Sequence, residues 1–311
     1  MHVLIGQIID EIEKVVVGKR PVIEMLLAAI LADGHVLLDD VPGVGKTTLA
    51  VTVSRTLGLE YKRVQFTPDV LPSDITGYSL YDKQSGGFVY MPGAVSAASI
   101  LLGDEINRTS SKTQSALLEA MEERQVTVDG QTHPLKNPFI VIATQNHVGT
   151  SGTQPLPYAQ LDRFLVKLSI GYPDFEHEMD IIRGRQSSNP VDAVKQITDC
   201  EKVLEMQNAV RNVTVKDSLI SYITALASAT REHENTELGI SPRGALCVNR
   251  MAKAMAYLND RDYMIPKDVR DVFLCVNSHR ILLSQKARAA QVTAEQVLTD
   301  VLDKVPVPGS T

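Results

Sequence analysis

The sequence predicts an α/β domain with a doubly wound parallel sheet, followed by a smaller domain built from helices. Up to about residue 172, short apolar runs that end in polar residues alternate with helical patterns, as buried parallel strands and their crossover helices do. Beyond about residue 192 the apolar spacing is helical, and strand-like runs are scarce. We therefore expect one domain at residues 1–186 and a second, helical domain at residues 187–311.

The composition fits a folded chain of about two domains. The chain has 311 residues, of which 44% are hydrophobic, and a formal net charge of −6, which gives no sign of a broad nucleic-acid-binding surface. Cys200, Cys247 and Cys275 are far apart, so no zinc ribbon or disulfide framework is indicated and a reducing, cytoplasmic location is expected. No apolar run approaches the roughly 18 residues of a membrane span, and no secretory signal is recognisable, so we expect no direct membrane insertion.

The N-terminal part predicts two helices, a short buried strand and a third helix, in that order. Isoleucines and valines at helical spacing indicate the first helix, and a proline suited to a first helical turn indicates the second. The strand, HVLLD, is apolar, and Gly58 terminates the helix that follows it. These elements are expected at residues 5–16, 21–34, 35–39 and 46–57.

Two more buried strands, SILLGDE and FIVIATQN, lie on either side of a helix in the sequence, and two hairpins accompany them. Ser111 and Gln114 have capping-box spacing at the start of the helix. One hairpin is expected to turn at Gly86-Gly87, and the other at Asp129-Gly130. The strands are expected at residues 99–105 and 139–146, the helix at 110–123 and the first hairpin at 79–90.

The segment DVPGVGKTT at residues 40–48 lies between a predicted strand and a predicted helix and resembles the phosphate-binding pattern G-x-x-x-x-G-K-[ST]. Gly43 and Gly45 would let the backbone wrap around phosphate oxygens. Lys46 would reach the β- and γ-phosphates, and Thr47 would place its hydroxyl on Mg²⁺. Asp40 replaces the first glycine and is compatible with binding if its side chain points away. The alternative is a plain glycine-rich turn, which the strand–loop–helix context disfavours.

Two consecutive carboxylates, Asp104 and Glu105, end the buried strand ILLGDE. ATP hydrolysis needs one carboxylate near the metal and a second that activates the attacking water. Asp104 would hold Mg²⁺, mostly through its water shell, and Glu105 would be the base or the group that orients the water. A solvated strand end is the alternative, and it is disfavoured only because the glycine-rich loop is also present.

Three further residues suit the same chemistry but are weak signals when taken singly. Asn146 ends FIVIATQN, where a neutral amide can orient water beside a γ-phosphate. Arg163 in QLDRF and Arg243 in SPRG are of the type that stabilises charge on a transferring phosphoryl group. An asparagine commonly suits a turn, and a lone arginine is commonly a surface residue.

Six segments, DVPGVGKT, QFTPDVLPSDITG, LLGDEINR, ATQN, LPYAQLDRF and SPRG, occur in this order. Together they resemble the MoxR family of AAA+ ATPases, over residues 17–269. The resemblance implies a three-layer α/β/α P-loop core with a parallel sheet of strand order 5-1-4-3-2, and a smaller C-terminal all-helical lid. It also implies an insertion in the helix after the second strand, at about 74–98, and a hairpin at about 124–136 before the strand that ends in Asn146.

The same resemblance implies roles for individual residues. Asn146 matches the sensor-1 position, Arg163 the arginine finger that acts on the ATP of a neighbouring subunit, and Arg243 the sensor 2 of the lid. Ser96 and Tyr158 depart from the family pattern at positions that bear on subunit contacts. ATP would be bound by Val17, Gly18, Pro42, Gly43, Val44, Gly45, Lys46, Thr47, Thr48 and Asp104, and Mg²⁺ by Thr47 and Asp104, largely through water.

The function that the resemblance implies is a Mg-ATP-hydrolysing ring ATPase, expected to be a hexamer, which acts as a chaperone or remodeller in the maturation or assembly of partner proteins with a von Willebrand factor A domain. A nucleic-acid motor is the first alternative, but the hairpins offer only Lys83, His133 and Lys136 as basic groups. A nucleotide-gated binding module is the second, and it would be expected to lack Glu105 or Arg163. Whether Arg243 contacts the ATP of its own subunit or of the next stays open.

Overall fold

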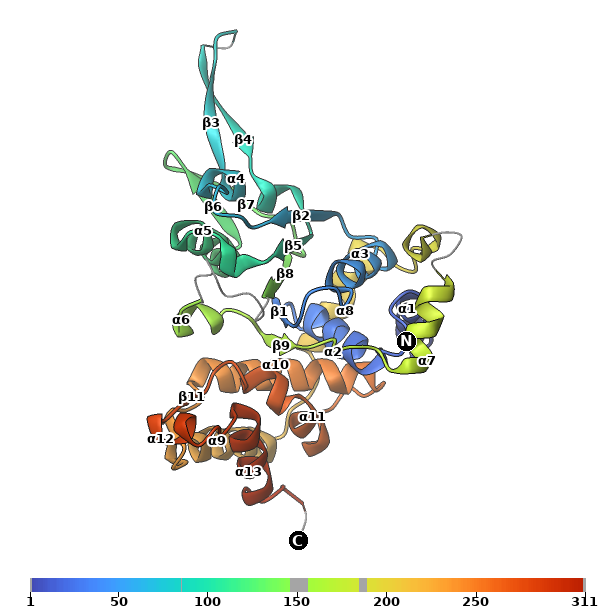
Figure 1. Cartoon of the computed structure of the whole chain (residues 1–311), viewed down its shortest axis with the longest axis vertical. Coiled ribbons are helices and arrows are strands. Elements are labelled where there is room, and N and C mark those ends of the chain that lie inside the picture. The colour runs from blue at the N-terminus through green and yellow to red at the C-terminus, as the bar shows by residue number, and fades with distance from the viewer. Residues whose placement is uncertain (1, 85, 146–155, 185–188, 310–311) are drawn as a thin grey trace.

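A five-stranded parallel sheet forms the centre of the N-terminal half of the molecule (Figure 1). The computed structural model describes residues 2–84, 86–145, 156–184 and 189–309. The strand order is β2-β5-β8-β1-β9, and every neighbouring pair is parallel. Counted along the chain, this is the predicted order 5-1-4-3-2. The strands are β1 (Val36–Asp39), β2 (Tyr61–Gln65), β5 (Ile100–Asp104), β8 (Ile140–Gln145) and β9 (Val166–Leu168).

Helices cover both faces of this sheet, which gives the predicted three layers. Alternate residues of β5 enter different apolar clusters. Ile100 and Leu102 pack with residues of α1, α2 and α3, whereas Leu101 packs with residues of α5. This two-sided burial explains why the central strands are continuously apolar in the sequence. The helices are α1 (His2–Glu13), α2 (Arg20–Leu31), α3 (Lys46–Thr56) and α5 (Ser111–Glu123).

The start of α5 differs from the predicted capping box by one residue. Ser110, not Ser111, is the N-cap, and its hydroxyl accepts a hydrogen bond from the backbone N–H of Thr113 at 3.3 Å. Gln114 instead donates its side-chain amide to the main-chain carbonyl of Ile106 at 3.1 Å. The prediction is wrong because this buried contact uses the Gln114 side chain, and because the extended backbone of Ser110 suits a cap.

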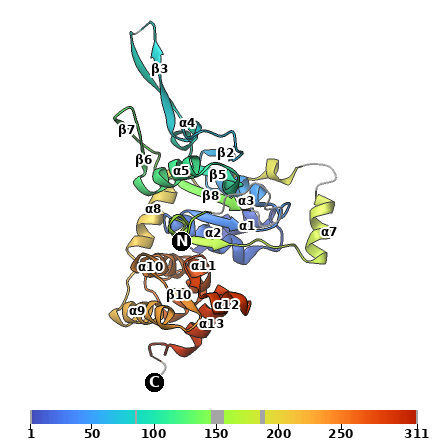
Figure 2. The same ribbon diagram turned by 60° about the vertical axis from the view of Figure 1, so that its left-hand side comes forward.

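Two hairpins project from the same end of the core (Figure 2). In the longer one, Asp82 pairs with Gly87, so the turn lies before Gly87 and not at Gly86-Gly87 as predicted; Gly86 has φ +69°. In the shorter one, Val128 pairs with Gln131, and the predicted Asp129-Gly130 turn is confirmed. The elements here are α4 (Pro72–Thr76), β3 (Gly77–Asp82), β4 (Gly87–Pro92), η1 (Ala94–Ala97), η2 (Ile106–Arg108), β6 (Gln125–Val128) and β7 (Gln131–Pro134).

The C-terminal part is helical, with a two-stranded antiparallel ladder, β10–β11, added to the predicted helices. The predicted domain boundary at 186/187 stays a prediction; the first helix after it, α8, packs on α2, where Gln207 donates to the carbonyl of Ile30 at 2.8 Å. No helix of the described chain is long and apolar enough to span a membrane. The remaining elements are α6 (Tyr158–Leu161), α7 (Phe175–Gly184), η3 (Pro190–Ala193), α8 (Cys200–Arg211), α9 (Asp217–Glu232), β10 (Thr236–Leu238), α10 (Pro242–Leu258), α11 (Pro266–Asn277), β11 (Leu282–Leu283), α12 (Gln285–Ala289) and α13 (Ala294–Lys304).

Candidate active site

A cavity of about 570 Å³ lies beside the glycine-rich loop and the carboxyl end of β5. It brings together the loop, the two consecutive carboxylates and the segment before α2, which the sequence analysis singled out separately. The segment after β9 and one side of α7 complete its wall. The lining residues that had been predicted as site residues are Val17, Pro42, Gly43, Val44, Gly45, Lys46, Thr47, Thr48, Asp104 and Glu105.

The loop has the backbone geometry that phosphate binding needs. Gly43 and Gly45 have φ of +86° and +94°, and a Cβ atom at either would meet nothing within 4 Å. The dihedral angles, not crowding, therefore require glycine here. Lys46 at the start of α3 donates to the main-chain carbonyls of Asp40 at 2.7 Å and Gln145 at 3.1 Å. Burial lowers the pKa of Lys46, against the opposing effect of nearby carboxylates, first among them Asp40.

Asp40 points away from the loop, as its position in the motif requires. Its Oδ2 accepts hydrogen bonds from the backbone N–H groups of Ile170 at 2.6 Å and Gly171 at 2.8 Å, and its Oδ1 accepts one from Val41 at 3.0 Å. Burial acts to raise the pKa of Asp40, but the hydrogen bonds from Gly171 and Ile170 outweigh it, so the pKa is lowered. The residue thus connects the loop to another wall of the cavity.

The two carboxylates are held by neighbouring strands. Thr144 of β8 donates its hydroxyl to Asp104 Oδ1 at 2.6 Å and accepts the backbone N–H of Glu105 at 2.9 Å. On β2, Arg63 donates to Asp104 Oδ2 at 2.7 Å, and Gln65 donates to Glu105 Oε2 at 3.0 Å. Glu105 itself has a left-handed backbone, with φ +56°, which is uncommon for a residue with a side chain and often marks functional sites.

Arg63, Gln65 and Thr144 were not predicted from the sequence. Their signal is weak, since two polar residues at alternate positions of a short strand suit any edge strand. Only the parallel pairing, which sets Gln65 opposite Asp104, shows that β2 faces the carboxylates. Arg108 was also missed; it donates to Glu105 Oε2 at 2.8 Å.

The wall opposite the loop is formed by α7 and the chain before α2. Gly18 does not line the cavity, but a Cβ atom there would lie 2.5 Å from Nδ1 of His177, so the glycine allows α7 to approach. Lys19 donates to the carbonyl of Tyr172 at 2.8 Å. Tyr172 and Ile182 were missed by the sequence analysis; both line the cavity and are largely exposed. This apolar wall suits a planar base.

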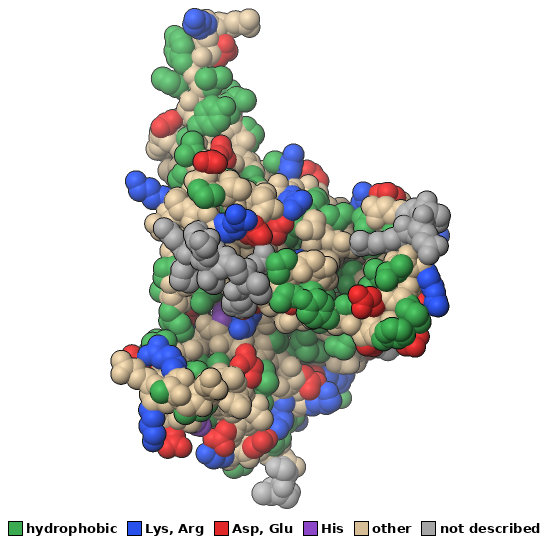
Figure 3. All heavy atoms as spheres, viewed as in Figure 1, with side chains coloured by type: hydrophobic (Ala, Val, Ile, Leu, Met, Phe, Trp, Pro, Cys, Tyr) green, Lys and Arg blue, Asp and Glu red, His purple; other side chains and the backbone are tan. Residues whose placement is uncertain are grey.

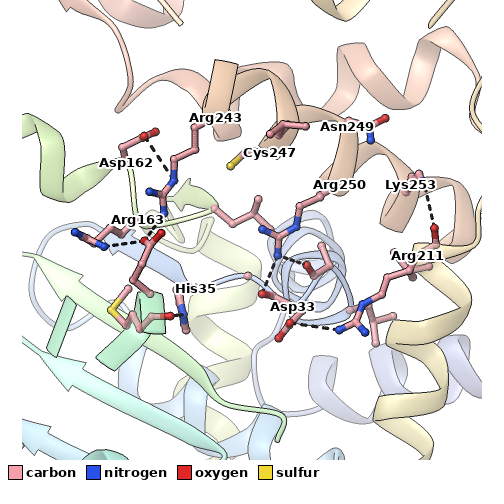
Figure 4. A pocket seen from close by; sticks show the side chains of 18 of the residues that line it. Asp33, His35, Asp162, Arg163, Arg211, Arg243, Cys247, Asn249, Arg250 and Lys253 are labelled. Carbon is pink, nitrogen blue, oxygen red and sulfur yellow. Dashed lines mark hydrogen bonds and ion pairs between the residues drawn. The ribbon is translucent and has the colours of Figure 1, made fainter. Parts of the chain in front are cut away.

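Arg163 and Arg243 lie together in a second cavity of about 730 Å³, between α2, α5, α8 and α10 (Figure 4). Arg163 donates to Glu122 Oε2 at 2.7 Å, and Arg243 to the same oxygen at 2.5 Å. The hydrogen bond from Arg243, followed by the contact with Arg163, lowers the pKa of Glu122, although partial burial acts to raise it. Within the described chain, no residue lines both cavities. Asn146, the remaining predicted site residue, lies outside the described residues.

The donor set of the first cavity fits a magnesium–nucleotide complex. Thr47, Asp104 and Glu105 line it together with the positive-φ loop. The described residues contain no group of three or more His, Cys, Asp or Glu side chains that would form a metal centre by itself. One hydroxyl and one carboxylate suit an ion that takes its other ligands from phosphate and water, as Mg²⁺ does.

Comparison with known proteins agrees with this geometry. Residues 35–166 match the model of the ATPase family associated with various cellular activities, and residues 228–301 match an AAA lid domain. The chain is 46% identical to the uncharacterized protein YeaC of Bacillus subtilis, covering 99% of this chain and 96% of that protein. It is 40% identical to the chaperone MoxR1 of Mycobacterium tuberculosis, covering 96% and 81% respectively.

A crystal structure from Cytophaga hutchinsonii, described as that of an inferred ATPase, has the same fold. Its TM-score is 0.90 at 42% sequence identity, with 98% of this chain and 95% of that chain covered. The two family models account for the core and for the helical lid. The chain therefore belongs to the MoxR family of AAA+ ATPases.

Proposed function

We propose that this protein binds and hydrolyses Mg-ATP as a ring, in which six copies are expected, and that it acts as a chaperone or remodeller of partner proteins. The observation that carries the proposal is the single cavity of about 570 Å³ that unites the phosphate-binding loop with Asp104 and Glu105. A binding module would need only the loop. Hydrolysis additionally requires carboxylates beside the loop, and Asp104 and Glu105 are both present in the same cavity.

Each residue of the cavity has a distinct task in this proposal. The backbone N–H groups around Gly43 and Gly45 bind phosphate oxygens, and Lys46 offsets their charge. Thr47 and Asp104 would hold Mg²⁺, which neutralises charge that develops on the phosphates. Glu105 accepts a proton from the attacking water. Its hydrogen bonds from Gln65 and Arg108 orient the carboxylate before substrate binds.

Arg163 and Arg243 support the ring arrangement. Both lie in the second cavity and bind Glu122 there, so neither lies beside its own glycine-rich loop. We propose that both act on the ATP of the neighbouring subunit, with Glu122 holding them until that subunit docks. The sequence left open whether Arg243 acts on the ATP of its own subunit or of the next, and this proposal assigns it to the next.

The chaperone role rests on the relative in M. tuberculosis that carries this name and on the exposed apolar surface of the β3–β4 hairpin (Figure 3). Phe88 is 76% exposed, and Leu80 and Tyr81 are more than half exposed. Such a surface favours contact with a polypeptide over contact with nucleic acid, which would need basic groups. A client that contains a von Willebrand factor A domain is part of the proposal.

The test is an ATP-trap experiment with Glu105→Gln. This variant should bind ATP with unchanged affinity, release phosphate at least about 100-fold more slowly, and retain a client protein only while ATP is present. Glu201→Gln is the control, because Glu201 is an exposed carboxylate of α8 outside both cavities. A variant that hydrolyses ATP at the wild-type rate would contradict the role of Glu105. Recovery of nucleic acid without a protein would favour a motor instead.

A further inference from the structure

Arg280 is a buried cation that contacts the segment carrying Arg163. It follows α11 in the helical lid, its side chain is 1% exposed, and it is the largest fully buried side chain in the described part of the protein. Burying a guanidinium is unfavourable unless its donors are paired. The acceptors that pair with its donors therefore show which part of the chain Arg280 holds in place.

The guanidinium holds the chain on both sides of Arg163. Its Nε donates to Asp162 Oδ1 at 2.7 Å, and its Nη2 to the main-chain carbonyls of Asp162 at 3.1 Å and Phe164 at 2.5 Å. Its Nη1 donates to the carbonyl of Leu165 at 3.2 Å. Three of these acceptors are backbone groups, so the contacts fix the path of the chain at residues 162–165 and not only one side chain.

Asp162 extends this contact to Arg243. Its second oxygen, Oδ2, lies 3.7 Å from Nε of Arg243, in the first turn of α10. Arg243 and Arg163 then share Glu122. Positive and negative groups thus alternate from the buried lid residue to the open cavity, in the order Arg280, Asp162, Arg243, Glu122 and Arg163.

We infer that Arg280 is a positioning residue for ATP hydrolysis by the neighbouring subunit. It fixes the backbone of Arg163 and, through Asp162, the side chain of Arg243. Both arginines therefore keep the same position relative to each other and move together with the lid. This inference rests on the proposed function, in which the two arginines act in trans. In the part of the chain that the structure describes, no hydrogen-bond partner of Arg280 lines the cavity of the glycine-rich loop. Replacing Arg280 should therefore leave ATP binding by its own subunit unchanged.

The first experiment compares Arg280→Lys with Arg261→Lys in the full-length protein. Arg261 is a matched control, because it makes a two-point ion pair with Asp268 at 2.7 and 2.5 Å inside the same lid but lies away from residues 162–165. For Arg280→Lys, kcat should fall about 10- to 100-fold, the range that a displacement of about 1 Å produces, while the affinity for ATP changes less than about twofold. Arg261→Lys should leave both unchanged.

A purely structural role would give a different result. Equal losses of kcat in both variants, or a loss of ATP affinity in Arg280→Lys, would overturn the inference. If Arg280→Lys does not fold, Asp162→Asn replaces it: the amide keeps an acceptor oxygen for Arg280 but removes the charge, and the same fall in kcat with unchanged ATP affinity is expected. Unchanged kcat in that variant would also contradict the inference.

A mixing experiment separates this inference from the proposed function. Subunits with Glu105→Gln are expected to hydrolyse ATP at least about 100-fold more slowly, but they offer intact arginines to a neighbour. Glu105→Gln subunits should raise the ATPase rate when they are added to Arg280→Lys subunits. They should also raise it when they are added to Arg163→Ala subunits. A mixture of wild-type and Glu105→Gln subunits provides the reference rate. If Arg163→Ala subunits are rescued and Arg280→Lys subunits are not, the positioning role is wrong and action in trans stands. If neither is rescued, action in trans fails, and the inference fails with it.

Discussion

Asp40 occupies the position at which phosphate-binding loops of this pattern carry a glycine, and its carboxylate has a structural task there. The hydrogen bond from Lys46 to Asp40 goes to the main-chain carbonyl, which any residue at this position could provide. The carboxylate instead accepts hydrogen bonds from the N–H groups of Ile170 and Gly171 after β9, and both residues line the cavity of the glycine-rich loop. The φ angle of Asp40 is not positive, so glycine has no conformational advantage at this residue.

The variant Asp40→Gly restores the consensus glycine and should nevertheless lower the free energy of unfolding. It removes the acceptor of the backbone N–H groups of Val41, Ile170 and Gly171, and each of these that stays buried without a partner costs about 1–3 kcal/mol. It also raises the conformational entropy of the unfolded chain. We expect a loss of about 2–5 kcal/mol in urea denaturation, with weaker ATP binding. Asp40→Asn keeps one acceptor oxygen and should lose less. A glycine variant as stable as the wild type would show that these contacts contribute nothing.

Two buried histidines make the stability of the protein sensitive to acid. His35 Nδ1 accepts the N–H of Val141 at 3.0 Å, and its Nε2 donates to the carbonyl of Met121 at 3.1 Å. Burial, with a contribution from nearby Arg124, lowers the pKa of His35 from 6.5 to about 3. Burial also lowers the pKa of His279, next to Arg280, well below 6.5. Both imidazoles are therefore neutral in the folded protein.

The free energy of unfolding should therefore fall as the pH decreases below 6.5. In the unfolded chain these histidines take up protons below 6.5, whereas in the folded chain His35 stays neutral down to about pH 3. Their contribution is fully present above pH 6.5 and decreases by about 1.4 kcal/mol per pH unit for each histidine. Urea denaturation between pH 7.5 and pH 4.5 measures this slope, and His35→Gln should make it shallower. An unchanged slope in that variant would contradict the assignment.

At the scale of elements, the central strands could be predicted from the sequence because each is a local apolar run; β5 is buried at every position. The loop and its glycines could be predicted for the same reason. Residues that connect one element to another could not be predicted from the sequence. Gln65 reaches Glu105 only because β2 pairs with β5, and Arg280 contacts an aspartate 118 residues earlier in the chain. A local pattern does not encode such pairings.

The hairpins illustrate the same division. The Asp129-Gly130 turn was predictable from its dipeptide, but the contact between the two hairpins was not. Tyr90 of β4 stacks on His133 of β7, with ring centroids 3.8 Å apart and planes at 9°. The Tyr90 hydroxyl also donates to the carbonyl of Thr76 at 2.6 Å. The ring stack joins the long hairpin to the short one, and the hydrogen bond fixes Tyr90 to the end of α4.

A double-mutant cycle should detect this coupling. Tyr90→Leu and His133→Ala each remove the ring stack, so their combined effect on the free energy of unfolding should be smaller than the sum of the single effects, by about 0.5–1.5 kcal/mol. Tyr90→Phe keeps the stack and loses only the hydroxyl contact, and it should retain the coupling to His133. Additive effects of the two single variants would indicate that the hairpins are independent.

At the scale of the whole molecule, the groups that we propose for hydrolysis are divided between two cavities. Within the described chain, Lys19 and Lys46 are the cations that line the cavity of the glycine-rich loop. Arg163 and Arg243 line the other cavity, between the core and α10 of the lid. Charge that develops on the transferring phosphoryl group is commonly stabilised by an arginine. In the proposed ring, the described residues of one subunit therefore place no arginine beside its own ATP, and a second subunit would supply it.

The ATPase rate per subunit should consequently rise with protein concentration until assembly is complete. Arg163→Ala should lower the plateau by about 10³-fold, the range known for such arginines, without changing the affinity for ATP, because Arg163 lies outside the loop cavity. Arg183→Ala, an exposed arginine at the end of α7, is the control and should keep the wild-type profile. Phosphate release measured across the assembly range, with mass determined by light scattering, provides both quantities. A constant rate from a demonstrated monomer would show that one subunit contains every group it needs.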